Sequence, residues 1–296
     1  MSEFQLIGLV GRHADVRVAP TLLALCDIVH HLGCRVAIEP DACGLEQVPQ
    51  TVHRLTRVQM AALCQLVIVV GGDGTLLSVA RDVTPGAIPI LGINQGRLGF
   101  MVDVLPQEMA QVLTAVLAGD YVREDRLLLE ARVHRGGHST PTALAINDVV
   151  VRNQAAIRML EFETWLGDEF ISHHRADGFI VASPTGSTAY ALSGGGPVVH
   201  PALEAMTLVP ICPHTLSDRP IVVGAQQTVR IVLRGPSDTL ATCTCDGQNS
   251  QNLNSGEVLE VRRSDYRLQL IHPNNYSYFS ILRDKLHWGS GPVKLL

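Results

Sequence analysis

The sequence lacks the features of several classes of protein. Its net charge is −5, so it has no global basic field to attract nucleic acid or an anionic membrane. Its apolar runs are far shorter than the roughly 20 residues of a membrane-spanning helix. Residues 1–11 contain no basic segment and no cleavage-like site, so we expect no signal peptide. We therefore predict neither a nucleic-acid partner nor a membrane partner.

Paired cysteine motifs are also absent. The chain has seven cysteines, an odd number, and no two of them form a CxxC pair. This spacing disfavours both a disulfide framework and a zinc site. We expect free, buried thiols in a reducing cytoplasm.

The first part of the chain alternates strands and helices. The 296 residues favour two domains, and a hydrophobic content of 46% is ample for a large core. Apolar runs predict strands, and apolar residues at helical spacing predict helices, in an order typical of a parallel sheet with crossover helices. The predicted strands are 6–10, 35–39, 66–70 and 87–94, and the predicted helices are 20–32, 56–64, 76–81 and 106–117.

A β-rich part begins near residue 122. Many of its segments alternate apolar and polar residues, as half-buried antiparallel strands do. We predict an α/β domain at 1–122 and a β-rich domain at 123–276, with a helical tail, 277–296, that packs back on the first domain. The predicted strands of the second domain are 127–134, 142–151, 158–165, 169–174, 179–183, 219–223, 228–233, 239–245 and 258–262.

The most informative stretch is Gly71-Gly72-Asp73-Gly74-Thr75, between a buried strand and a helix. Glycines let the backbone turn sharply and approach a ligand, and the N-terminus of the helix favours an anion. Asp73 is a carboxylate where phosphate would bind, which suggests a proton acceptor or a neighbouring cation. The alternative is a plain strand-to-helix turn in which Asp73 or Thr75 caps the helix.

A second glycine-punctuated loop, 94–100, follows the next strand. Two polar loops at strand ends of one open α/β sheet predict a ligand crevice at its carboxyl edge. Phe100 is either a wall of that crevice or an ordinary core aromatic.

The β-rich part has its own polar segments. Residues 184–197 combine hydroxyl side chains with glycines, which suits a phosphate or a ribose, and Ser187 or Thr188 would cap a following helix. Asn147-Asp148 could hold ribose hydroxyls or could form a simple Asx turn. Asp246-Gly247-Gln248 resembles a hairpin turn. His173 and His174 are adjacent on a strand and face opposite sides, which disfavours a shared metal ion.

Together these segments resemble the bacterial NAD kinase family. The resemblance covers nearly the whole chain in order, including residues 279–288. The first motif also occurs in lipid kinases and 6-phosphofructokinases, whereas the run Pro184-Thr185-Gly186-Ser187-Thr188-Ala189-Tyr190 is much more specific. The family implies a Rossmann-like α/β domain and a β-rich domain, with the site in the cleft between them.

The resemblance also implies residue roles. Asp73 matches the proton acceptor for the 2′-hydroxyl of the adenosine ribose, and Asp148 stands where many relatives carry Glu. Phosphate and ATP would contact Gly71, Gly72, Gly74 and Thr75. The implied NAD contacts are Asp73, Gly74, Phe100, Asn147, Asp148, Arg158, Arg175, Asp177, Thr185, Thr188, Ala189, Tyr190, Ala191, Leu192, Ser193 and Gln248.

The implied reaction is transfer of the γ-phosphoryl group of ATP to NAD. Charge neutralisation would come from a divalent cation, most simply Mg²⁺, for which no protein ligand is assigned. The family further implies a homodimer or homotetramer. Two alternatives remain at this point: a non-catalytic NAD(P)-binding regulator, and a lipid or sugar kinase that shares only the first motif.

Overall fold

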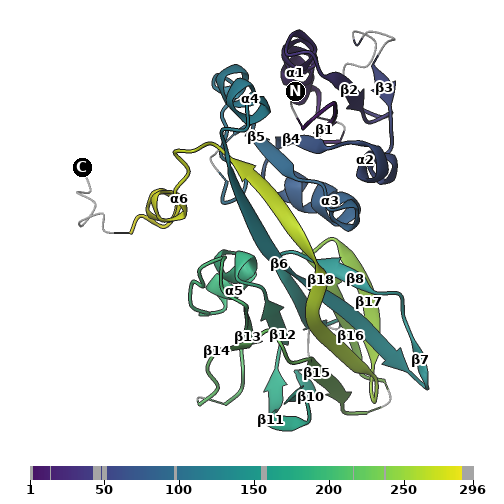
Figure 1. Cartoon of the computed structure of the whole chain (residues 1–296). Helices are drawn as coiled ribbons and strands as arrows, with labels where there is room; N and C mark the ends of the chain where they lie inside the picture. The colour runs from purple at the N-terminus through teal and green to yellow at the C-terminus, as the bar shows by residue number, and fades with distance from the viewer. Residues whose placement is uncertain are drawn as a thin grey trace. The chain divides into compact units, whose positions relative to one another are not determined.

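The protein forms two compact units (Figure 1). The structure, a computed structural model, describes residues 3–13, 15–42, 48, 52–96, 99–154, 159–215, 217–236 and 238–288. Unit 1 comprises Met1–Asp125 and Leu268–Leu296, and unit 2 comprises Arg126–Arg267. The predicted division after residue 122 lies three residues from the first of these, at 125, and the predicted division after residue 276 lies nine residues beyond the second, at 267. No described helix is long and apolar enough to span a membrane.

Unit 1 is built on a parallel sheet. Its strands lie in the order β18-β5-β4-β1-β2-β3, with every neighbouring pair parallel. The carboxyl ends of β1 and β4 flank the point where the strand order reverses, which is where open α/β sheets bind ligands. The strand bounds are β1 Leu6–Gly11, β2 Arg35–Ile38, β3 His53–Arg54, β4 Leu66–Gly71, β5 Ile90–Asn94 and β18 Val258–His272.

Helices cover the sheet of unit 1. α1 and α4 pack on one face over a cluster that contains Leu22, Leu113 and Ile68, and α2 and α3 contact each other. The helix predictions are confirmed for the most part. The structure adds that Thr56 caps α2 and that Gly33 follows α1 with φ +81°. The bounds are α1 Ala19–His31, α2 Arg57–Leu63, α3 Asp73–Val83, α4 Met109–Leu117 and α6 Tyr278–Leu286, with short 3₁₀ turns at Val16–Val18 and Thr84–Gly86.

Unit 2 is formed by two antiparallel layers. One contains β11-β10-β15-β18 together with β6, β7 and β8, and the other has the order β14-β13-β12-β9-β16-β17. Their inward side chains, such as Phe162 and Phe179, form one core. The bounds are β6 Val122–Arg135, β7 His138–Ser139, β8 Ala143–Ala145, β9 Asp148–Asn153, β10 Leu160–Leu166, β11 Glu169–Ala176, β12 Gly178–Ala182, β13 Ala205–Ile211, β14 Ile221–Gly224, β15 Val229–Arg234, β16 Leu240–Cys245 and β17 Asn249–Asn254.

The second layer has a further small core on its other face. Val150, Ile180 and Val209 pack there against Ala191 of the four-residue helix α5, Tyr190–Ser193. This layer therefore has the main core on one side and α5 on the other, and the polar segment 184–197 is held against its strands.

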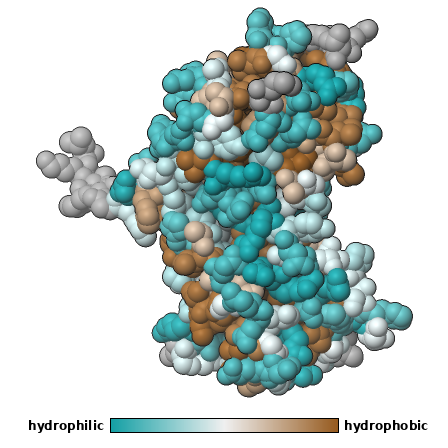
Figure 2. Space-filling model, viewed as in Figure 1, coloured by the Kyte–Doolittle hydropathy of each residue, from teal (hydrophilic) through white to brown (hydrophobic). Residues whose placement is uncertain are grey.

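Several sequence predictions were incomplete or wrong. β13 and β17 were missed, because β13 contains Pro210 and β17 is polar with only Leu253 buried. The expectation that all cysteines are buried is wrong for Cys212, which is exposed; the other described cysteines are buried and free, and Cys43 lies outside the described residues. On the face drawn in Figure 2, hydrophobic residues form scattered patches among hydrophilic ones.

Candidate functional site

The first group of site residues surrounds Asp73 in unit 1. Asp73 is the first residue of α3, and its carboxylate accepts hydrogen bonds from the backbone N–H groups of Phe100 at 2.8 Å and Met101 at 3.1 Å. Gly72 is the N-cap, and no side chain caps α3. The helix-cap alternative for Asp73 and Thr75 is therefore wrong, and the Asp73 carboxylate is oriented by a different loop.

Gly99 makes this arrangement possible. A Cβ added at Gly99 would lie 2.1 Å from Oδ1 of Asp73, so any larger residue there would displace the carboxylate. The loop is anchored at its start by Asn94, whose Oδ1 accepts the N–H of Gly96 at 2.7 Å and whose Nδ2 approaches the carbonyl of Val102 at 3.4 Å. Asn94, at the end of β5, and the Asp73 carboxylate therefore fix the described ends of this loop by hydrogen bonds.

The glycines of the motif differ in what surrounds them. A Cβ at Gly71 would lie 2.6 Å from Oγ1 of Thr75, so Gly71 is required by internal packing. A Cβ at Gly72 or Gly74 would meet nothing within 4 Å. The packing of the protein therefore does not require glycine at these two positions. There is open space beside them, at the N-terminus of α3.

Phe100 is half-buried rather than a core residue. The ammonium group of Lys285, on α6, lies 5.9 Å from the centre of its ring. The interpretation as an ordinary core aromatic is therefore wrong. Lys285 was not predicted, because its approach to Phe100 depends on where the C-terminal helix packs.

The second group of residues lines a pocket of ≈ 270 Å³ in unit 2. Asn147 and Asp148, at the start of β9, lie opposite Ala189 and Tyr190. The structure thus brings together four of the predicted residues from two separate segments. The full lining is Asn147, Asp148, Val150, Arg152, Ala189, Tyr190, Thr244, Asp246 and Gly247.

Asp246 orients this pocket, although the sequence suggested only a turn. Asp246 and Gly247 have φ values of 51° and 64° and connect β16 to β17, which confirms the hairpin. The Asp246 carboxylate accepts the N–H groups of Ile146 at 3.1 Å and Asn147 at 2.7 Å. Asp246 therefore holds the backbone that presents Asn147 and Asp148.

The Asp148 side chain is buried in this setting. Only 5% of the residue is exposed. Burial, and then the neighbouring charge of Asp246, raises the pKa of Asp148 from 3.8 to about 7. A carboxyl group with such a pKa can gain or lose a proton near neutral pH, and shifts of this kind are concentrated at functional sites.

Arg152 is a pocket residue that the sequence analysis missed. Its guanidinium lies 6.0 Å from the centre of the Tyr190 ring. Asp148, Val150 and Arg152 share one face of β9, because side chains alternate along a strand. The period of two, counted from Asp148, would have identified Arg152.

The segment from Thr185 to Ser193 differs from its prediction. Neither the 3₁₀ turn Thr185–Thr188 nor α5 has a side-chain cap, so the predicted capping by Ser187 or Thr188 is wrong. Ser187 is buried, and its hydroxyl accepts the N–H of Val199 at 2.9 Å. This hydrogen bond joins the 3₁₀ turn to the chain that follows α5. Thr185 and Ala191 are buried, whereas Thr188 and Leu192 are half-buried and Ser193 is exposed.

The remaining predicted contacts do not line the pocket around Asp148. Arg175 forms an ion pair with Glu161 at 3.2 Å, and Asp177 and Gln248 are exposed. Arg158 lies outside the described residues. His174 is buried while His173 is exposed, which confirms that they face opposite sides. Within the described residues, no group of three or more His, Cys, Asp or Glu side chains could hold a metal ion.

Comparison with known proteins confirms the resemblance. Family models of the ATP-NAD kinase N-terminal and C-terminal domains match residues 20–121 and 146–273. The NAD kinase of Chromohalobacter salexigens is 44% identical over 292 residues, which cover 98% of this chain and 99% of that protein. The NAD kinase of Nitrosococcus oceani is 43% identical over 286 residues, 97% of each chain.

Solved structures agree with this result. An NAD kinase from Archaeoglobus fulgidus in complex with ATP has a TM-score of 0.74 and 26% identity, covering 96% of this chain and 99% of that one. Yeast NADH kinase complexed with NADH has a TM-score of 0.85 and 23% identity, covering 97% and 89%, and it supports the fold. The chain therefore belongs to the ATP-NAD kinase family.

Proposed function

We propose that the protein transfers the γ-phosphoryl group of ATP to the 2′-hydroxyl of the adenosine ribose of NAD, giving NADP and ADP. The observation that carries this proposal is the Asp73 carboxylate, held by two backbone N–H groups beside two glycines that face open space. This combination supplies a proton acceptor next to room for a phosphate group. The family relationship supports NAD and ATP as the substrates.

In the proposed chemical step, Asp73 is the base. The 2′-oxygen of the ribose attacks the γ-phosphorus, the O2′–P bond forms, and the bond from the γ-phosphorus to the bridging oxygen breaks, releasing ADP. The 2′-hydroxyl proton passes to the Asp73 carboxylate. Because a ribose hydroxyl is a weak acid, we expect this transfer late, as the O–P bond forms. A general base of this kind contributes about 10²–10⁴-fold to the rate.

Gly72 and Gly74 are proposed to accommodate the triphosphate. The N-terminus of α3 lies beside this open space, and the helix dipole favours negative charge there. Gly71 and Thr75 shape the turn that leads into α3. The ATP complex of the Archaeoglobus fulgidus relative supports ATP as the donor.

A divalent cation, most simply Mg²⁺, is proposed to accompany ATP. Mg²⁺ is usually held by one or two carboxylates together with substrate phosphates, not by a cage of protein ligands. When bound, the ion would neutralise triphosphate charge and offset its repulsion from Asp73.

The pocket of Asp148 is proposed to hold the dinucleotide. Asn147 and Asp148 offer an amide and a carboxyl group to ribose hydroxyls, and Tyr190 offers a ring for packing. Thr188, Ala189, Leu192 and Ser193 would extend this wall. Further NAD contacts are proposed for Phe100, Arg158, Arg175, Asp177, Thr185, Ala191 and Gln248.

The test is a coupled assay. Purified protein is mixed with NAD, ATP and Mg²⁺, and NADP is measured with an NADP-specific dehydrogenase, alongside Asp73→Asn. We expect NADP from the wild type and almost none from the variant. A wild-type protein that binds NAD in calorimetry but releases no NADP or ADP would contradict the proposal.

A homodimer or homotetramer in the cytoplasm is also proposed. β14 is an edge strand of its described layer and leaves Ile221 and Val222 exposed, which favours pairing with another chain. Light scattering during size-exclusion chromatography would measure the mass, and Ile221→Glu should reduce it. A monomeric wild type would contradict the proposed assembly.

A further inference from the structure

His272 is a buried histidine outside the residues assigned to substrates. It is the last residue of β18, and none of its surface is exposed. Its Nδ1 lies 2.9 Å from Oδ2 of Asp103, and its Nε2 lies 3.4 Å from Oε2 of Glu124. The Asp103 side chain is itself only 8% exposed. Burying an imidazole between two carboxylates costs desolvation free energy, which the contacts among the three groups must offset.

The surroundings of His272 favour its protonated form. Burial by itself lowers the pKa of His272, but the hydrogen bond to Asp103 and the nearby charges of Asp103 and Glu124 outweigh burial and raise it above 6.5. The Tyr276 ring stacks on the imidazole at 3.8 Å, and its hydroxyl donates to Glu124 at 3.3 Å.

A pocket of ≈ 560 Å³ beside this cluster adds negative charge. Asp103 and Tyr276 line the pocket together with Glu108, Asp120 and Asp284, and none of the described residues that line it is a lysine or an arginine. No basic side chain among the described lining residues therefore competes with His272 for Asp103. The contact that holds the Asp103 carboxylate is the one with His272 Nδ1, at 2.9 Å.

Asp103 belongs to the segment that orients Asp73. It lies two residues after Met101, whose N–H donates to the Asp73 carboxylate. On its other side, Val104 is bound to β5, where its carbonyl accepts the N–H of Asn94 at 2.7 Å. The Asp103–His272 contact is thus a side-chain anchor at the end of the same short segment.

We propose that His272 is a positioning residue: by binding Asp103 and Glu124 it fixes the segment 99–104, whose N–H groups hold Asp73. The proposal rests on the proposed role of Asp73 as the base. His272 touches neither substrate nor phosphate in this scheme. It acts only through the loop.

The test uses His272→Gln and Asp103→Asn in the full chain. We expect kcat to fall about 10- to 100-fold in each, because misplacing a catalytic group by about 1 Å can reduce the rate by that much. The KM values for NAD and ATP should stay near those of the wild type. The double variant should lose little more than either single variant, since both break one contact.

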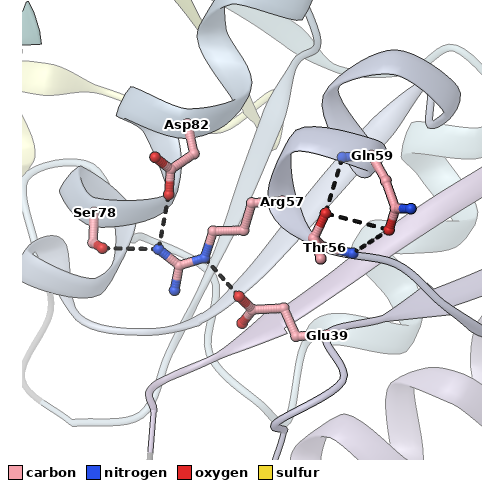
Figure 3. A network of polar contacts seen from close by, with 6 residues as sticks. All are labelled: Glu39, Thr56, Arg57, Gln59, Ser78 and Asp82. Carbon is pink, nitrogen blue, oxygen red and sulfur yellow. Dashed lines mark hydrogen bonds and ion pairs between the residues drawn. The ribbon is translucent and has the colours of Figure 1, made fainter.

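A matched control is available elsewhere in unit 1. Arg57 bonds Glu39 at 2.6 Å and also contacts Ser78 and Asp82 (Figure 3). Glu39→Gln breaks a half-buried ion pair without touching the segment 99–104. We expect it to lower the melting temperature while kcat, measured well below that temperature, is retained.

The pH profile gives a second readout. In the wild type kcat should fall as the pH rises through the raised pKa of His272, because a neutral imidazole cannot bind both carboxylates as well. His272→Gln should lack this alkaline decrease. If that variant does not fold, Asp103→Asn carries the test, with a depressed kcat at every pH.

Several results would overturn the proposal. These are wild-type kcat in folded His272→Gln and Asp103→Asn, a rise in KM for NAD in place of a fall in kcat, or an equal loss of kcat in Glu39→Gln. If Asp73→Asn still abolishes turnover in those cases, only the role of His272 fails. If Asp73→Asn turns over normally, the proposed base fails first.

Discussion

Both units contain a glycine that lets one segment approach another closely, although unit 1 is an α/β structure and unit 2 is built from antiparallel strands. In each, a polar loop approaches a candidate site residue at a glycine, where there is no room for a larger side chain. Gly99 backs the carboxylate of Asp73 in unit 1, and a Cβ at Gly186 would lie 2.0 Å from the carbonyl oxygen of Asn147 in unit 2. Close backbone approach, made possible by glycine, therefore shapes both groups of residues.

The carboxylates of the two groups differ in their surroundings. Asp73 is half-buried at a helix N-terminus and accepts two backbone hydrogen bonds, beside open space. Asp148 is buried at the start of a strand, and the pKa of its carboxyl group is raised to about 7. The first arrangement suits a partly accessible carboxylate that takes a proton from a substrate. The second suits a buried carboxyl group that pairs with the hydroxyls of a ligand.

The largest effect should come from replacing Asp73. Asp73→Asn keeps the size of the side chain and removes the base, so we expect kcat to fall about 10²–10⁴-fold. NAD binding should be largely retained, because the proposed dinucleotide pocket lies in unit 2. Steady-state kinetics and calorimetry measure the two quantities. Near-normal kcat in a folded variant would remove the assignment of Asp73 as the base.

Asp148 should influence stability in a pH-dependent way. Its carboxyl group titrates near 3.8 when unfolded and near 7 when folded, so the buried charge destabilises the fold. This penalty is absent below about pH 4, grows as the pH rises to 7 and is complete above it, at a size on the order of 4 kcal/mol.

Asp148→Asn should therefore be more stable than the wild type at pH 8, and the difference should shrink as the pH falls toward 4. Urea unfolding at several pH values measures it. Parallel pH curves for the two proteins would show that Asp148 does not carry the burial penalty. Asn147→Ala, beside it, is the control and should leave the pH dependence unchanged.

Substitutions of Gly99 and Gly186 should affect catalysis and NAD binding differently. Gly99→Ala displaces the Asp73 carboxylate, so we expect kcat to fall about 10- to 100-fold while the Kd for NAD changes little. Gly186→Ala pushes on the carbonyl of Asn147 and should weaken NAD binding, with less effect on kcat at saturating NAD. The reverse pattern would contradict the division of roles between the two units.

The smallest effect on stability is expected at Gly74. A Cβ there meets nothing, and alanine favours a helix over glycine by about 1 kcal/mol, so Gly74→Ala should fold at least as well as the wild type. If phosphate approaches this position, the KM for ATP should rise severalfold. An unchanged KM would show that the triphosphate does not use this space.

Much of unit 1 could be predicted from the sequence because its signals are local. Continuous apolar runs such as Leu66–Gly71 specify buried parallel strands. The Thr56 hydroxyl caps the start of α2, and Gly33 follows α1 with a positive φ. The family resemblance also pointed to Asn147 and Asp148, which line one pocket in the structure. These features depend on residues that are neighbours in the chain.

The sequence predictions failed where contacts between residues distant in the chain decide the structure. The sequence suggested that Ser187 or Thr188 caps a helix, but the Ser187 hydroxyl instead accepts the N–H of Val199. β17 is mostly polar and forms because it pairs with β16. Arg152 was overlooked although its spacing from Asp148 places both on one face of β9.

The sequence by itself determined most of the elements of unit 1, the glycine-rich turn with its acid, and the family resemblance. Only the tertiary structure decided what orients that acid, since Phe100, Met101 and Gly99 reach Asp73 from the next strand's loop. It also decided that Asp246 holds Asn147, about a hundred residues away, and that Asp148 is buried. The physical reason is that hydrogen-bond partners and burial depend on which strands become neighbours, and a sequence pattern records only the local preference of each strand.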